Sequence, residues 1–74
     1  MALLVRIVSV RTGREVSRVA LDDAGVISYS GGDTAQTTVA RVMSEFDLSE
    51  ADAIGALSRD GWSNGYLMVA LDQQ

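Results

Sequence analysis

Residues 3–21 read LLVRIVSVRTGREVSRVAL, and the expected fold is built outward from this stretch. Its two ends, residues 3–10 and 15–21, are rich in β-branched and other apolar residues, which is typical of β-strands. The polar segment between them contains Gly13, and glycine readily adopts the positive φ that tight turns need. The stretch therefore predicts a β-hairpin.

A third strand is expected directly after this hairpin. Residues 22–25 (DDAG) place two acids first and a glycine last, the order that type I turns favour. Residues 26–30 (VISYS) then have strand composition again. Gly31 and Gly32 interrupt the pattern, so residues 3–30 are predicted to form a three-stranded meander.

Two helices are expected next. Asp33 is the predicted N-cap of the first helix, with Gln36 completing a capping box, and this helix should run over residues 34–46. Ser49 is the predicted N-cap of a shorter second helix over residues 50–58. The apolar residues of the first helix fall on one stripe that should pack on the sheet: Val39, Val42, Met43 and Phe46.

A fourth strand is predicted at the end of the chain. The second helix should stop at Gly61, and Asn64 with Gly65 forms a dipeptide that favours a type I′ turn. Residues 66–71 (YLMVAL) again have strand composition. The predicted order is βββααβ, a small two-layer α+β fold that spans residues 1–74 as a single domain. Its sheet should be mostly antiparallel, with both helices on one face.

The composition excludes most common catalytic centres. The chain contains no His and no Cys, and its six basic residues are all Arg. It therefore lacks an imidazole base, a thiolate nucleophile, a Schiff-base lysine and the ligands of typical zinc sites. We expect no enzyme activity, no metal and no cofactor. The enzymatic alternative would rest on Asp33, or on Asp22 and Asp23, with neighbouring hydroxyls, and would need a pocket of about 300 Å³.

The small core has no covalent brace. A chain of 74 residues without Cys depends on oligomerisation or on docking to a larger partner for additional stability. Residues 3–10 and 66–71 are apolar on both sides of the predicted strands, although two helices cover only one face of the sheet. Either arginine side chains shield the other face, or that face or a sheet edge docks on another chain. We expect a homo-oligomer.

Charge is unevenly distributed along the chain. Residues 1–21 carry four arginines and one glutamate, whereas residues 22–74 carry two arginines and nine acids. A bipolar chain suits head-to-tail packing or a partner of mixed charge, although charges of both signs also keep a small surface soluble. The net charge of -4 argues against nucleic-acid binding, and no apolar run is long enough to span a membrane.

Two groups of residues are candidate interaction sites. Residues 61–66 (GWSNGY) contain the only Trp of the chain, which is either a plug of the core or a contact residue. The hairpin arginines could clamp acidic groups or form a solvated rim. Gly31 and Gly32 precede a helix and could hold an anion, but Asp33 would repel phosphate, so no small-molecule ligand is expected. The candidate residues are Trp62, Asn64, Tyr66, Arg6, Arg11, Arg14 and Arg18.

Three features together resemble small uncharacterised proteins encoded near the head and capsid genes of actinobacterial phages and prophages. They are residues 28–34 (SYSGGDT) before a helix, an alanine-rich second helix, and GWSNGY at residues 61–66 before a last strand. The resemblance implies a non-enzymatic minor capsid or capsid-accessory protein, present in multiple copies, whose partner is itself or the major capsid protein. It also implies a virion location after synthesis in the host cytoplasm. The alternative is a small regulatory protein that binds a host protein.

Overall fold

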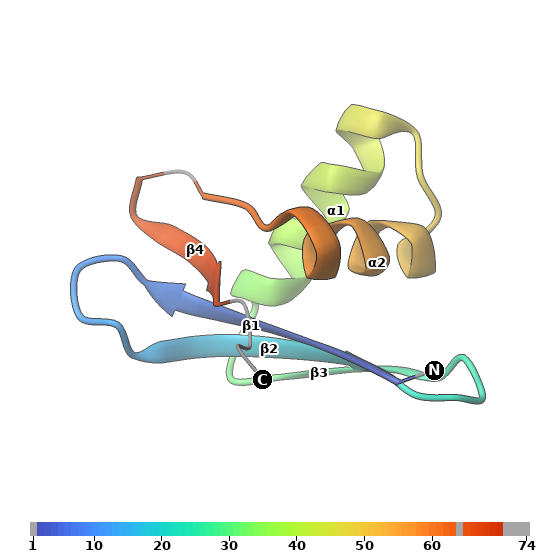
Figure 1. The fold of residues 1–74 in the computed structure, drawn as a ribbon, viewed down its shortest axis with the longest axis horizontal. Helices are drawn as coiled ribbons and strands as arrows, with labels where there is room; N and C mark the ends of the chain where they lie inside the picture. Colours follow the sequence, from blue (N-terminus) through green and yellow to red (C-terminus); the bar gives the residue numbers. More distant parts are fainter. Residues whose placement is uncertain (1, 64, 71–74) are drawn as a thin grey trace.

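The computed structural model describes residues 2–63 and 65–70 as a four-stranded sheet with two helices on one face (Figure 1). The order across the sheet is β3-β2-β1-β4, and each neighbouring pair is antiparallel. The α+β class is therefore confirmed. The elements are β1 (Leu3–Ser9), β2 (Glu15–Leu21), β3 (Ile27–Ser30), α1 (Thr34–Phe46), α2 (Glu50–Asp60) and β4 (Leu67–Ala70).

The predicted boundaries of the first five elements agree closely with the structure. The bounds of β2 and α1 are those expected, β1 ends one residue earlier, β3 begins one residue later, and α2 continues to Asp60. Asn64 of the predicted type I′ turn lies outside the described residues, as does residue 71 at the end of the predicted last strand.

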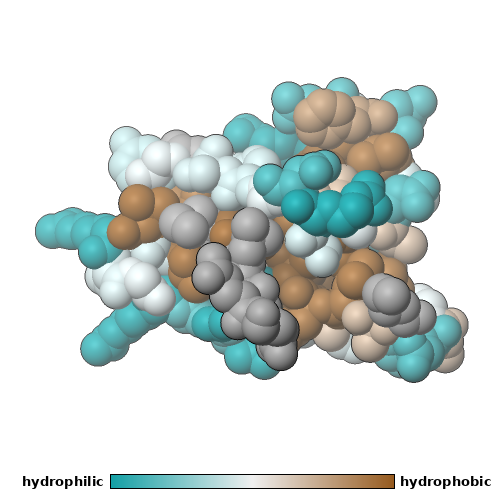
Figure 2. All heavy atoms as spheres, viewed as in Figure 1, coloured by the Kyte–Doolittle hydropathy of each residue, from teal (hydrophilic) through white to brown (hydrophobic). Residues whose placement is uncertain are grey.

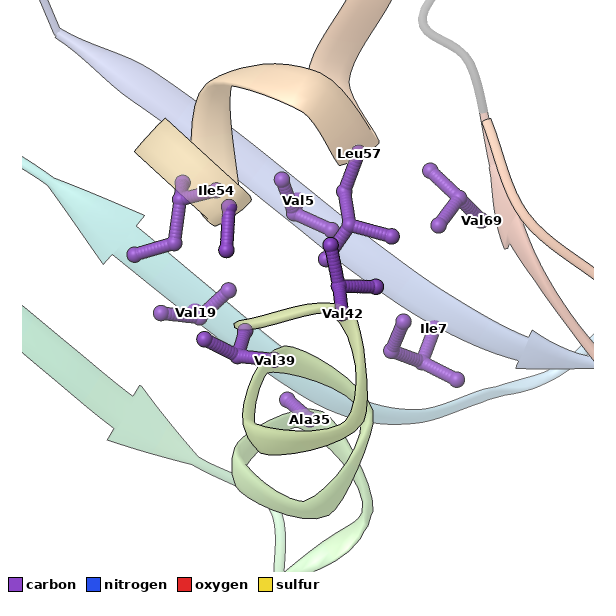
Figure 3. Close-up of a cluster of buried hydrophobic side chains, with 10 residues drawn as sticks. Val5, Ile7, Val19, Ala35, Val39, Val42, Ile54, Leu57 and Val69 are labelled. Carbon is purple, nitrogen blue, oxygen red and sulfur yellow. The ribbon is translucent and has the colours of Figure 1, made fainter. Parts of the chain in front are cut away.

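The core lies between the helices and one face of the sheet. Val5 pairs with Val19 on β2, and Ile7 pairs with Val69 on β4, so these four side chains share the helix-facing side. Figure 3 shows them pointing toward the side chains of α1 and α2, which close the core from above. The buried helix residues of this cluster are Ala35, Val39, Val42, Ala53, Ile54 and Leu57.

The N-terminus of α1 is capped from the sheet. Asp33 has helical backbone angles (φ -88°, ψ -9°) and makes no side-chain cap hydrogen bond within the described part of the chain. The predicted capping box of Asp33 and Gln36 is therefore wrong. Instead, the Oγ of Ser17 in β2, which is 1% exposed, accepts a hydrogen bond from the Ala35 N–H at 3.1 Å. A residue far away in the sequence thus supplies the acceptor that the helix end needs.

The same serine fixes the connection between β3 and α1. The Ser17 hydroxyl donates toward the carbonyl oxygens of Ser30 at 3.0 Å and Gly32 at 3.2 Å. Between them, Gly31 has a φ of 81°, and a Cβ there would lie 3.1 Å from Ser17 Cα and from the Val16 carbonyl oxygen. The connection therefore requires glycine both for its backbone angle and for its close approach to β2.

Both ends of α2 follow the prediction. The Ser49 Oγ accepts a hydrogen bond from the Asp52 N–H at 3.2 Å, which confirms the N-cap. At the other end, Gly61 has a φ of 75°, and its N–H donates to the Leu57 carbonyl at 3.0 Å. The second helix begins and ends on local signals, unlike the first.

A hydrogen bond joins β3 to the start of α2. The Tyr29 hydroxyl donates to Glu50 Oε2 at 2.6 Å, and the Tyr29 ring packs against the core. Burial, followed by the hydrogen bond to this carboxylate and its charge, raises the pKa of Tyr29 above its ordinary value. The edge strand is thereby tied to the helical layer.

Candidate functional site

Trp62 lies between the helical layer and the sheet and lines two surface hollows. It follows the C-cap of α2, and its carbonyl accepts a hydrogen bond from the Val69 N–H at 2.9 Å. Its side chain is half-buried and packs against the core. Trp62 therefore supports the core and also forms part of the surface, and its role as a contact residue stays a prediction.

The larger hollow lies where the C-terminal ends of α1 and α2 meet, and we call it the helix-end hollow. Its volume is about 430 Å³ and its lining is predominantly apolar. Figure 2 shows brown apolar surface between hydrophilic side chains at the upper right, over the C-terminal end of α1. The lining residues are Val42, Phe46, Leu48, Ala56, Leu57, Asp60, Gly61 and Trp62.

Phe46 is the main departure from the predicted core. The periodicity of α1 places it on the same stripe as Val39 and Val42, which are buried, yet Phe46 is 63% exposed. The last turn of α1 rises away from the sheet (Figure 1), so its apolar stripe continues past the surface that it covers. The helix ends there at Asp47, in a left-handed conformation with φ 55°. An aromatic ring is thus left at the mouth of an apolar hollow.

The second hollow, which we call the threonine hollow, has a volume of about 350 Å³ and a more polar lining. Its buried hydroxyl is already satisfied, because Thr38 Oγ1 donates to the Thr34 carbonyl at 2.8 Å. Its other polar groups belong to residues that are exposed or half-buried. The lining residues are Asp33, Thr34, Thr37, Thr38, Arg41, Trp62 and Leu67.

The acids of the enzymatic alternative lie in different places. Asp33 lines the threonine hollow, whose volume reaches the size that the alternative required. Asp22 and Asp23 instead lie in the β2–β3 turn, where Asp22 Oδ1 accepts hydrogen bonds from the N–H groups of Ala24 and Val26, both at 2.9 Å. No group of three potential acidic metal ligands occurs among the residues that the structure describes.

Arg6 and Arg18 lie together on the face of the sheet that the helices leave open. They are direct cross-strand partners, and Glu15 neutralises the repulsion between them. Arg6 Nε lies 2.9 Å from Glu15 Oε1, and an Arg18 terminal nitrogen lies 2.7 Å from Oε2. Arg18 and then Arg6, through their hydrogen bonds, hold the pKa of Glu15 below its ordinary value.

A β-bulge makes this three-residue network possible. Glu15 and Arg18 are three residues apart, so regular alternation would put them on opposite faces. The register shifts between Ile7 and Val8 of β1. Ile7 pairs with Ser17 but Val8 pairs with Glu15, so Val16 is the extra residue of the bulge. The centre of this open face is consequently charged. Shielding of the face by arginine side chains therefore agrees better with the described residues than docking of the face on another chain.

The remaining two candidate arginines lie at one end of the sheet with Tyr66. Arg11 and Arg14 are exposed in the β1–β2 turn, and the Val10 N–H donates to the Tyr66 carbonyl at 2.8 Å. Tyr66 is 81% exposed and Val10 is 47% exposed. Figure 2 shows hydrophilic side chains protruding at this end beside apolar surface. We call these four residues the hairpin tip.

The candidate residues are therefore divided among three places. Trp62 lies at the hollows, Arg6 and Arg18 on the open face, and Arg11, Arg14 and Tyr66 at the hairpin tip, while Asn64 lies outside the described residues. The sequence did not point to the lining residues Leu48 and Ala56. The one sequence signal for this hollow was that the apolar stripe of α1 extends to Phe46, the last residue of the helix.

Comparisons with protein-family models, with curated proteins and with solved structures find no match to this chain. Within the described residues, none of the helices combines the length and the apolar character that crossing a membrane would require.

Proposed function

We propose that this chain is a non-enzymatic interaction module that binds another polypeptide in the helix-end hollow. The observation that carries the proposal is Phe46, which is 63% exposed at the mouth of a hollow of about 430 Å³ with a predominantly apolar lining. Fully burying a Phe side chain contributes about 1.5–3 kcal/mol, so covering this ring would give roughly half of that or more. Hollows with an aromatic anchor and few polar groups favour protein contacts.

In its specific form, the module is a minor capsid or capsid-accessory protein that assembles in multiple copies in a virion. The resemblance carried by residues 28–34 and 61–66 supports this setting, and so does the absence of Cys from a chain of 74 residues. The partner is then the major capsid protein or the chain itself. The second candidate is a regulator of a host protein. Asp60, which lines the hollow, and Glu45 and Asp47, the exposed chain neighbours of Phe46, favour it because they suit a basic partner.

The proposed architecture of the module is the full βββααβ order, with the last strand beside the first. The pairing of Leu67–Ala70 with residues 6–9 of β1 supports it. The Val69 N–H of this strand donates a hydrogen bond to the Trp62 carbonyl and so helps to hold Trp62 beside the helices. The position of the last strand therefore shapes the hollow that the function uses.

A photo-crosslinking experiment tests the proposed function. Benzoylphenylalanine replaces Phe46 in one variant and Ser28, which is exposed on the edge strand β3, in a matched control. After irradiation in the producing cells, the Phe46 variant should give discrete polypeptide adducts that the Ser28 variant does not give. An adduct containing the major capsid protein or a second copy of the chain supports assembly, and one containing a host protein supports regulation. The absence of adducts, or identical adducts from both positions, would refute the proposal.

A further inference from the structure

We infer that the helix-end hollow receives the hairpin tip of a second copy of this chain, an inference that rests on the proposed function and names its partner. The hairpin tip does not line this chain's own hollow, because none of its four residues is among the lining residues of the hollow. Figure 1 shows the β1–β2 turn and the α1–α2 connection on opposite sides of the view. One chain therefore leaves its own hollow empty. A second chain can fill it, and this second chain offers its own hollow in turn.

The chemistry of the hairpin tip fits such a hollow. Tyr66, 81% exposed, is the most exposed large apolar side chain among the residues that the structure describes, and Val10 beside it is 47% exposed. Tyrosine is common among interface anchors because it has an apolar body and a polar end. Arg11 and Arg14 flank these two residues and are both exposed. The hairpin tip is thus an aromatic plug with a basic surround.

Acidic residues line the hollow or adjoin its residues in the chain. Asp60 lines it, and Glu45 and Asp47 are the exposed chain neighbours of Phe46. The C-terminal ends of α1 and α2 both lie there, and helix C-termini favour cations. One arginine of this region, Arg59, lies along α2 beside Gly55. An apolar hollow with an acidic rim therefore meets an apolar tip with basic flanks.

This contact gives the charge asymmetry of the sequence a physical role. The basic residues of the β1–β2 turn and the acids of the helix ends lie on different surfaces of one molecule, so copies can associate head to tail. Such a heterologous contact repeats from copy to copy and forms a ring or a chain. It accounts for assembly in multiple copies without a disulfide or a metal.

Charge reversal and sedimentation velocity test the inference. The tip variant is Arg11→Glu with Arg14→Glu, and the rim variant is Glu45→Arg with Asp60→Arg, all at exposed positions. Wild type should associate with rising concentration, and each variant alone should associate about tenfold more weakly. An equimolar mixture of the two variants should recover the wild-type association, because a reversed tip then meets a reversed rim.

A second pair of variants tests the apolar part of the contact. Tyr66→Ser should weaken association about tenfold. Val26→Ser, at a 56% exposed position in the β2–β3 turn, should leave it unchanged. Circular dichroism checks that each variant is folded. A wild type that stays monomeric up to about 1 mM, a mixture that fails to recover, or an equal effect of both serine variants would overturn the inference. If a Phe46 crosslinker still captures a different polypeptide, the proposed function stands while the second copy is refuted.

Discussion

Replacing Ser17 by alanine removes the acceptor that caps α1 from the sheet. The Ser17 Oγ accepts from the Ala35 N–H at 3.1 Å and donates toward two carbonyl oxygens of the β3–α1 connection. Ala35 is fully buried, so water cannot easily replace the lost acceptor. The two carbonyls belong to exposed residues, and solvent can replace the lost donor there. The cost of the substitution should therefore come mainly from one buried N–H.

The magnitude follows from that single group. Leaving a buried donor unsatisfied costs about 1–3 kcal/mol, and losing a helix N-cap costs about 0.5–2 kcal/mol. Both ranges describe the same bond, so we expect Ser17→Ala to lower the free energy of unfolding by about 2 kcal/mol. A core of this size supplies only about 3–5 kcal/mol. The melting temperature should fall by about 8–16 °C, because each kcal/mol corresponds to about 4–8 °C in a small domain.

Urea unfolding followed by Trp62 fluorescence measures this loss, with Asp33→Ala as the matched control. Asp33 makes no side-chain cap hydrogen bond within the described residues, so at about 0.5 M salt, which screens its charge at the helix end, its replacement should cost about 0.5 kcal/mol or less. A conventional N-cap at Asp33 predicts the reverse order. The capping of α1 from the sheet is refuted if Asp33→Ala lowers the free energy of unfolding more than Ser17→Ala does, while both variants keep the wild-type slope of that free energy against urea concentration.

Three further predictions concern other contacts. Gly31→Ala should cost at least about 1 kcal/mol more than Gly13→Ala in urea unfolding, because both glycines have positive φ but only a Cβ on Gly31 meets the β2 backbone; equal costs would contradict the close approach. Tyr29→Phe should cost about 1–2 kcal/mol by removing its hydrogen bond to Glu50, and a double-mutant cycle with Glu50→Gln should show that the two effects overlap rather than add. The pKa of Glu15 is lowered in the folded state, so its contribution to stability is present above its ordinary pKa and is lost as the pH falls through the folded pKa. Glu15→Gln should therefore be less sensitive to acid than wild type between about pH 6 and about pH 3, and identical pH profiles in chemical denaturation would count against the arginine network.

Local signals were sufficient to predict the elements. The alternation of apolar residues in β2, the turn residues before β3 and the Ser49 N-cap all act within a few positions of the chain. The bounds of β2 and the start of α2 therefore follow from neighbouring residues, whereas α1 has the expected bounds although its N-terminal cap comes from the sheet. Neighbouring residues also predict the exposed β1–β2 turn, since polar turns between strands lie at the surface.

The candidate site depends on contacts that no local pattern contains. The open face has a charged centre because a bulge at Val16 turns Glu15 toward both of its arginines, and a one-residue shift leaves little trace in the sequence. Phe46 fits the apolar stripe of α1, yet it is exposed because the last turn of this helix rises away from the sheet.

The sequence by itself determined the bounds of the first three strands and of the two helices to within two residues, the uneven charge, and the lack of imidazole and thiol chemistry. Tertiary structure alone decided that Ser17 caps α1, that Glu15 joins its arginines, and that Phe46 opens a hollow beside Trp62. The physical reason is the sequence separation over which each kind of interaction acts. Helix and strand formation respond to interactions within one or two turns, whereas capping across the sheet, register and burial depend on which distant segments meet.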